Sequence, residues 1–197
     1  LAEKSFIKNI NFWYDEYLEN GLDAIISNTS GCGTTLKDYG YIFRNNKDLK
    51  KKAKKISELT KDIAEYLDDN IKLEFNKKKQ KYKIAYHSAC SMQHGQKIHK
   101  EPFNLIKKTG NEVFEIPEGH ICCGSAGTYN LLQSEIAQDL LKNKIFNIEK
   151  IKPEIISTGN IGCINQIATK TKIPILHTVE IMDWYTGGPK PDILQKI

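Results

Sequence analysis

The stretch Ile155-Ile156-Ser157-Thr158-Gly159-Asn160-Ile161-Gly162-Cys163 predicts a short buried strand, followed by a glycine-containing turn that carries a cysteine. An earlier stretch, Ile25-Ile26-Ser27-Asn28-Thr29-Ser30-Gly31-Cys32, has the same order of apolar strand, small polar residues and Gly-Cys. The two cysteines lie 131 residues apart. Two such copies in one chain indicate that a single structural unit has been duplicated.

The repeat extends on both sides of the two cysteines. When they are aligned, the helical pattern of residues 1–20 falls on residues 132–151. A weaker match joins Ser57-Glu58-Leu59 to Val179-Glu180-Ile181 and requires a shorter loop in the second copy. We therefore expect two units: a partial first one at residues 1–75 and a complete second one at residues 76–197. On this interpretation the chain is the downstream piece of a longer or split protein.

Strands and helices alternate along the predicted second unit. Strands are expected at residues 82–86, 112–116, 154–157 and 174–176, and helices at residues 102–109, 129–149 and 179–184, with a short helix after Cys163. This alternation predicts an α/β fold, in which a parallel sheet is covered by helices on both faces. The whole chain is then two pseudo-repeated parallel-sheet units, the first one truncated, joined by a charged linker at residues 70–81.

The cysteines are the residues most indicative of function. There are five, Cys32, Cys90, Cys122, Cys123 and Cys163, and the odd count and the adjacent pair argue against a disulfide framework. The last four each follow a predicted strand of the second unit. Loops that follow parallel strands emerge at one edge of the sheet, so these four thiols are expected to converge there. Cys32 is expected to lie in the other unit, about a domain away.

Four converging thiolates need a cation, and both iron and zinc accept tetrahedral sulfur ligation. The chain has no C-x-x-C pair, which weakens zinc-ribbon and thioredoxin-like interpretations. Gly124 and Gly127 open the predicted long helix, so its N-terminal N–H groups are expected to stabilise the thiolates of Cys122 and Cys123 or the sulfur of a cluster.

Histidines lie close to the predicted sheet edge as well. Each of His87, His94, His120 and His177 is a candidate ligand or proton carrier, and the alternative for each is a hydrogen-bonded loop histidine. His99 is expected on the surface.

The net charge of +5 comes largely from lysines at residues 50–55 and 77–79. Arg44 is the chain's one arginine and aromatic residues near these lysines are few, so nucleic-acid binding is not expected. No apolar run approaches the roughly 20 residues that cross a bilayer, and the start of the chain does not resemble a signal peptide. These features predict a cytoplasmic location.

Three motifs carry a family resemblance. His87-Ser88-Ala89-Cys90, the stretch from Cys122-Cys123-Gly124 to Tyr129, and Asn160-Ile161-Gly162-Cys163-Ile164 resemble the cysteine-rich CCG domain, most closely the C-terminal half of the glycolate oxidase iron–sulfur subunit. Lactate-utilisation proteins, the small subunit of anaerobic glycerol-3-phosphate dehydrogenase and a subunit of heterodisulfide reductase contain related domains. Thr29-Ser30-Gly31-Cys32-Gly33 resembles the end of the first of the family's two such domains.

The resemblance implies an iron–sulfur electron-transfer subunit that is not catalytic alone. Such a subunit takes electrons from a flavin-containing subunit that oxidises a 2-hydroxy acid, and passes them towards the respiratory chain and the membrane quinone pool. It implies a cluster, expected to be 4Fe–4S, on Cys90, Cys122, Cys123 and Cys163, in a protein that is cytoplasmic or peripheral on the inner face of the membrane. Gln166 stands where heterodisulfide reductase has a further cysteine, which argues against that enzyme's cluster type.

Two alternatives to electron transfer remain from the sequence. One is a non-catalytic docking subunit whose cysteine site is vestigial, and the other is a structural domain stabilised by zinc. A brown protein after anaerobic purification favours the iron–sulfur interpretation, a colourless protein with zinc favours the structural one, and a colourless metal-free protein favours docking.

Overall fold

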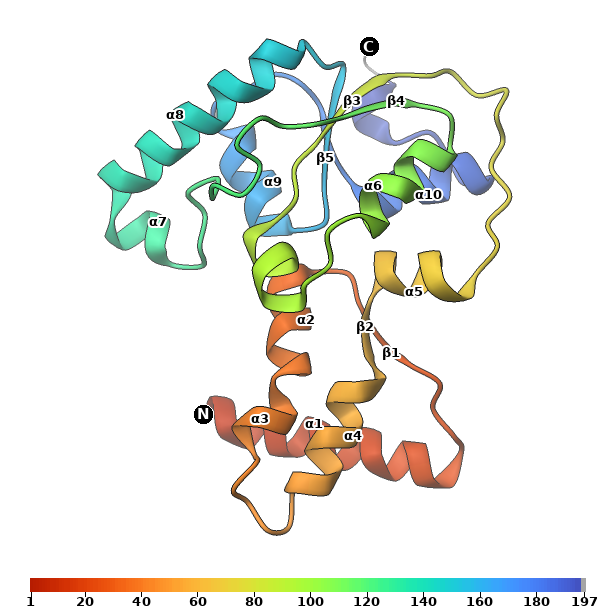
Figure 1. Cartoon of the computed structure of the whole chain (residues 1–197), viewed down its shortest axis with the longest axis vertical. Coiled ribbons are helices and arrows are strands. Elements are labelled where there is room, and N and C mark those ends of the chain that lie inside the picture. The colour runs from red at the N-terminus through yellow and green to blue at the C-terminus, as the bar shows by residue number, and fades with distance from the viewer. Residues whose placement is uncertain (196–197) are drawn as a thin grey trace.

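The computed structural model describes residues 1–195, and the larger part of the fold is built on a four-stranded sheet (Figure 1). The strands are β3 (Lys83–Tyr86), β4 (Glu112–Glu115), β5 (Ile155–Thr158) and β6 (Ile175–His177). Their order is β4-β3-β5-β6, and every neighbouring pair is parallel. The predicted α/β fold class and the four predicted strands are confirmed.

Helices cover both faces of this sheet, as the apolar strands require. On one face lie α6 (Glu101–Lys108) and α10 (Thr178–Thr186), and on the other α8 (Ser134–Ile151) and α9 (Ile161–Ala168). The strand side chains alternate between the two cores. Ile84 and Ile155 pack with α6 and α10, while Ala85 and Ile156 pack with α8 and α9.

A smaller unit precedes the larger one and lies below it in Figure 1. Its parallel strands are β1 (Ile25–Ser27) and β2 (Thr60–Asp62), and its helices are α1 (Ala2–Glu19), α2 (Ser30–Lys37), α3 (Tyr39–Ile42) and α4 (Lys50–Leu59). It has a separate core, which includes Ile10, Tyr39 and Ile56. The following helix, α5 (Ile63–Asn70), packs into the core of the larger unit through Ala64 and Leu67.

The repeat is visible in the order of the elements. An 18-residue helix precedes a short strand and a cysteine-bearing helix in both units, as α1-β1-α2 and as α8-β5-α9. Both following strands, β2 and β6, end in a residue that caps the next helix. Asp62 and Glu65 form this capping box at α5, and His177 and Glu180 form it at α10.

The weaker repeat match is wrong. Glu58 lies in α4, before β2, whereas Glu180 lies in α10, after β6. The structural counterpart of Glu180 is Glu65, because the two residues complete equivalent capping boxes. The similar tripeptides therefore reflect helical composition and not an equivalent position in the repeat.

The two units meet where their strands end. The N-terminal half of α2 packs on a turn of π-helix, η1 (Ser91–Gln96), that follows β3. The hydroxyl oxygens of Ser30 and Ser91 lie 2.7 Å apart, the Gln96 amide donates to the Ser30 carbonyl at 2.9 Å, and the Ser30 N–H donates to the Gly159 carbonyl at 3.3 Å. The carboxyl-terminal ends of the two sheets therefore face each other.

The predicted helix at residues 129–149 is interrupted. It consists of a single turn, α7 (Tyr129–Leu132), and of α8, with Gln133 between them in a non-helical conformation. A short 3-10 helix, η2 (Asp192–Leu194), ends the described part of the chain. Among residues 1–195, no helix combines the length and the apolar character needed to cross a membrane.

Candidate metal centre

The four cysteines of the larger unit line one hollow of about 430 Å³ at the carboxyl ends of its strands. Cys90 follows β3, Cys122 and Cys123 lie in the loop after β4, and Cys163 lies in the first turn of α9, directly after β5. The convergence predicted from the strand order is thus present in the fold. Parallel strands bring these loops to one edge although the cysteines are far apart in sequence.

Two of these cysteines form a compact, buried trio with His87, which does not itself line the hollow. One ring nitrogen of His87 and the sulfurs of Cys123 and Cys163 all lie within 4.8 Å of one another, and all three residues are buried. Neither ring nitrogen of His87 has a hydrogen-bond partner among residues 1–195. Because a buried polar atom is normally satisfied, this imidazole fits a place beside a metal ion or a charged sulfur.

Contacts between the thiols shift their proton affinities in opposite directions. Hydrogen bonds from Cys123 and Cys90 lower the pKa of Cys122 to about 2, and a hydrogen bond from Cys123 lowers the pKa of Cys163 to about 5. The same contacts raise the pKa of Cys90 and of Cys123. The group therefore favours two thiolates beside two thiols, and a bound cation would displace the remaining protons.

Two protein donors support the sulfurs. The Gly124 N–H donates to the Cys122 sulfur at 3.3 Å, and the Asn160 amide approaches the Cys163 sulfur at 3.5 Å. Gly127 lines the hollow but makes no such contact. The expected helix N-terminus is not the source of this stabilisation: α8 begins at Ser134, well beyond Gly124, because the chain first forms a loop and the single turn α7.

Lys144 is a positive charge that the sequence reasoning missed. Its side chain is 1% exposed, and its ammonium group donates to the Glu118 carbonyl at 3.2 Å. Burial lowers the pKa of Lys144, and the nearby Cys123, Cys122 and Cys163 act in the opposite direction. The sequence contained one indication that Lys144 is buried. Lys144 falls between Leu141 and Ile148, on the face of α8 that carries the buried apolar residues.

Cys32 and the smaller unit lie closer to the site than expected. Cys32 is exposed on α2 and does not line the hollow, but the adjacent Gly31 does. The expected separation of about a domain is therefore wrong, because α2 packs directly on η1, next to Cys90.

The remaining histidines are not placed among the cysteines. His94, His99 and His120 are exposed, as expected for His99. His177 caps α10, and one of its ring nitrogens lies 2.8 Å from the Asn28 carbonyl of the smaller unit. These two contacts give His177 a structural role at the junction of the two units.

Comparisons with known proteins agree with the motifs. Residues 84–168 match the cysteine-rich domain family CCG, and this match spans Cys90, Cys122, Cys123 and Cys163. The chain is 37% identical over 175 residues to the glycolate oxidase iron–sulfur subunit of Escherichia coli (strain K12), covering 89% of this chain and 42% of that protein. It is 26% and 22% identical to the lactate utilization protein A of Geobacillus sp. (strain WCH70) and of Bacillus subtilis (strain 168), each match covering 82% of this chain and 70% of the relative. The CCG resemblance predicted from the sequence is confirmed.

Proposed function

We propose that this chain is an iron–sulfur electron-transfer subunit, or part of one, in a complex that oxidises a 2-hydroxy acid such as glycolate. The observation that carries the proposal is the convergence of four thiols, from three separate loops, on one hollow in a CCG domain. The similarity to an iron–sulfur subunit of glycolate oxidase supports the same conclusion.

The donor set fits an iron–sulfur cluster. Cys90, Cys122, Cys123 and Cys163 supply soft sulfur ligands, for which a 4Fe–4S cluster is our preferred occupant. When bound, such a cluster supplies one-electron chemistry. The Gly124 N–H and the Asn160 amide already donate to ligand sulfurs, and hydrogen bonds of this kind raise the reduction potential of a cluster.

The partners follow from the same proposal. A flavin-containing subunit would oxidise the 2-hydroxy acid and deliver electrons, and the acceptor would lie towards the membrane quinone pool. The chain itself would be cytoplasmic or peripheral on the inner face of the membrane. It would transfer electrons without being catalytic alone.

The decisive experiment measures iron, labile sulfide and zinc in protein purified and reconstituted without oxygen. We expect iron and sulfide in the native chain, with an electron paramagnetic resonance signal after reduction. Cys122→Ser and Cys123→Ser should lose the iron, since both sulfurs belong to the group in the hollow.

Cys32→Ser is the matched control, because Cys32 is exposed and does not line the hollow. It should retain iron and sulfide. Zinc without sulfide would instead identify a structural site built on His87, Cys123 and Cys163, whose ligand atoms are close enough together to hold such an ion. Equal loss of iron in Cys32→Ser would show that both units contribute to one centre.

A further inference from the structure

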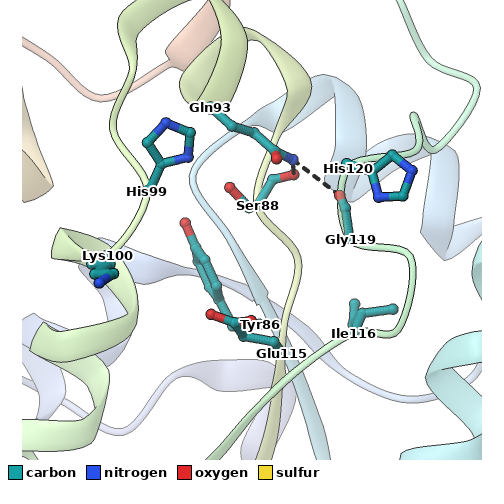
Figure 2. A pocket seen from close by; sticks show the side chains of 9 residues that line it. All are labelled: Tyr86, Ser88, Gln93, His99, Lys100, Glu115, Ile116, Gly119 and His120. Carbon is teal, nitrogen blue, oxygen red and sulfur yellow. Dashed lines mark hydrogen bonds between the residues drawn. The ribbon is translucent and has the colours of Figure 1, made fainter.

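A second cavity lies beside the cysteine centre and shares no lining residue with it. It has a volume of about 340 Å³ and opens between the ends of β3 and β4 (Figure 2). Tyr86 and Ser88 come from the end of β3, and Ile116, Gly119 and His120 from the segment after β4. Gln93 on η1 and the pair His99 and Lys100, before α6, complete the wall.

The cavity contains two hydroxyl groups whose hydrogen-bonding capacity is not filled. The Ser88 hydroxyl oxygen is buried and has no partner among residues 1–195. The Tyr86 phenol, 3% exposed, donates to the Met92 thioether at 3.6 Å and lies beside the Ser88 hydroxyl. Unsatisfied buried hydroxyls are costly, and a bound ligand would satisfy them.

The cavity is held in shape by its own polar contacts. The Gln93 amide nitrogen donates to the Ser88 carbonyl at 2.9 Å and to the Gly119 carbonyl at 3.0 Å, which ties η1 to the loop after β4 (Figure 2). Figure 2 shows the side chains of Tyr86, Ser88 and His99 directed toward one space. A small pocket with a few convergent polar groups is the usual form of a ligand site.

The wall contains several groups that can donate hydrogen bonds. Lys100 contributes an ammonium group, and His99 and His120 contribute imidazoles, in addition to the two hydroxyls. The carboxylate of Glu101, at the start of α6, accepts from the backbone N–H groups of His99 and Lys100 at 3.0 and 2.9 Å, so it is already occupied. Glu115 is an exposed residue at the rim of the cavity, and its carboxylate is an acceptor.

We propose that this cavity binds a small carboxylate of a few carbon atoms. Its oxygens accept from Ser88, Tyr86 and His99, Lys100 balances its charge, and its carbon chain packs on the Tyr86 ring. The binding requires no metal ion, so this proposal can be tested independently of the proposed iron–sulfur function of the cysteine centre. Because Ser88 and Cys90 flank a single residue, an occupied cavity lies next to the loop that holds one of the four thiols.

The test is a titration of the anaerobically purified full chain with sodium lactate and, separately, with neutral lactamide at constant ionic strength. Two-dimensional NMR and calorimetry follow the binding. We expect saturable lactate binding with a dissociation constant below about 10 mM, shifts centred on Ser88 and Gly119, and at least tenfold weaker binding of lactamide. Absence of saturation, or equal binding of the two probes, would overturn the proposal.

Variants separate the cavity from general surface charge. Ser88→Ala and Lys100→Gln should each weaken lactate binding at least fivefold without changing the iron content. Lys107→Gln, an exposed lysine of α6 outside the cavity, is the matched control and should bind as the native chain does. Tighter binding of inorganic phosphate than of lactate, or equal loss in the Lys107 variant, would contradict a carboxylate site.

Discussion

Gly124 shows how closely the loop after Cys123 packs against the start of α8. Its φ is +90°, and an added Cβ would lie 2.3 Å from the Ala137 carbonyl oxygen. The Gly124→Ala substitution strains the backbone at residue 124, and it also makes the new Cβ collide with the backbone carbonyl of Ala137. We expect it to lower the free energy of unfolding by about 2–4 kcal/mol and to reduce the iron bound per chain. Chemical denaturation and an iron assay measure the two effects.

Gly127 provides the control for this prediction. Its φ is +64°, but nothing lies within 4 Å of an added Cβ. Gly127→Ala should therefore cost only the left-handed backbone penalty, about 1 kcal/mol, and leave the iron content intact. Equal effects of the two substitutions would mean that the contact with Ala137 is not what requires glycine.

Asp62 makes stability depend on pH. Its side chain is 1% exposed, and burial raises its pKa from 3.8 to about 6. The folded state therefore binds this proton more tightly than the unfolded state, and the stabilisation present below pH 3.8 is lost as pH rises to about 6. Asp62→Asn keeps an oxygen that can accept from the Ala64 N–H but removes the titration.

We expect Asp62→Asn to gain stability over the native chain as pH rises from about 4 to 7, approaching about 3 kcal/mol. Urea denaturation at several pH values measures the difference. Asp139→Asn removes an exposed carboxylate paired with Lys142 and is the control. A constant difference across this pH range would show that the Asp62 carboxyl does not titrate between the two states.

Lys144 is placed to tune a cluster rather than to hold one. If the cysteines bind iron and sulfide, the buried ammonium group stabilises the more negative, reduced form. Lys144→Met should then lower the reduction potential by roughly 40 mV for each 1 kcal/mol of lost interaction, with iron content unchanged. Redox titration monitored by electron paramagnetic resonance tests this. Lys142→Met, an exposed neighbour on the same helix, should leave the potential nearly unchanged.

At the scale of elements, the contact between α2 and η1 joins the two units. The Thr34 hydroxyl lies 2.9 Å from the Ser30 carbonyl and 3.1 Å from the Ser91 carbonyl, so it links α2 to the residue that follows Cys90. The adjacent Thr35 hydroxyl donates only within its own helix, to Gly31 at 3.3 Å. The two threonines form a matched pair, because valine has the same shape and similar helix propensity.

We expect Thr34→Val to lower the free energy of unfolding by about 1 kcal/mol more than Thr35→Val. Thermal and urea denaturation of both variants, with native-state hydrogen exchange at η1, measure the effect. Faster exchange at η1 in the Thr34 variant alone would locate the loss at the junction. Indistinguishable variants would show that this hydroxyl does not couple the units.

The elements that the sequence predicts well are those with a clear hydrophobic period. The strands at β3 to β6 follow from apolar runs, and the shared edge of the cysteines follows from parallel topology alone. The interruption of the helix at Gln133 and the placement of α2 against η1 depend on contacts between distant segments, which periodicity does not encode. The burial of His87 could not be predicted for the same reason, because its neighbours come from other loops.

At the scale of the whole molecule, the two sheets differ in how their edges are covered. In the larger unit β5 pairs with β3 on one side and β6 on the other. In the smaller unit the equivalent strand, β1, pairs only with β2 among the described residues, and its Ile26 side chain is 41% exposed. An unpaired strand edge with an apolar side chain is a template for pairing with a further strand.

We therefore expect this chain to associate through β1, and in the absence of another partner to form a dimer at high concentration. Ile26→Lys places a charge on this edge and should weaken dimerisation at least tenfold, because a lysine on an edge strand opposes strand pairing. Analytical ultracentrifugation over a range of concentrations measures the equilibrium. Phe146→Lys, which adds the same charge at a 57% exposed residue of α8, should leave it unchanged. A native chain that stays monomeric throughout, or equal weakening by both substitutions, would show that the β1 edge is not the surface of association.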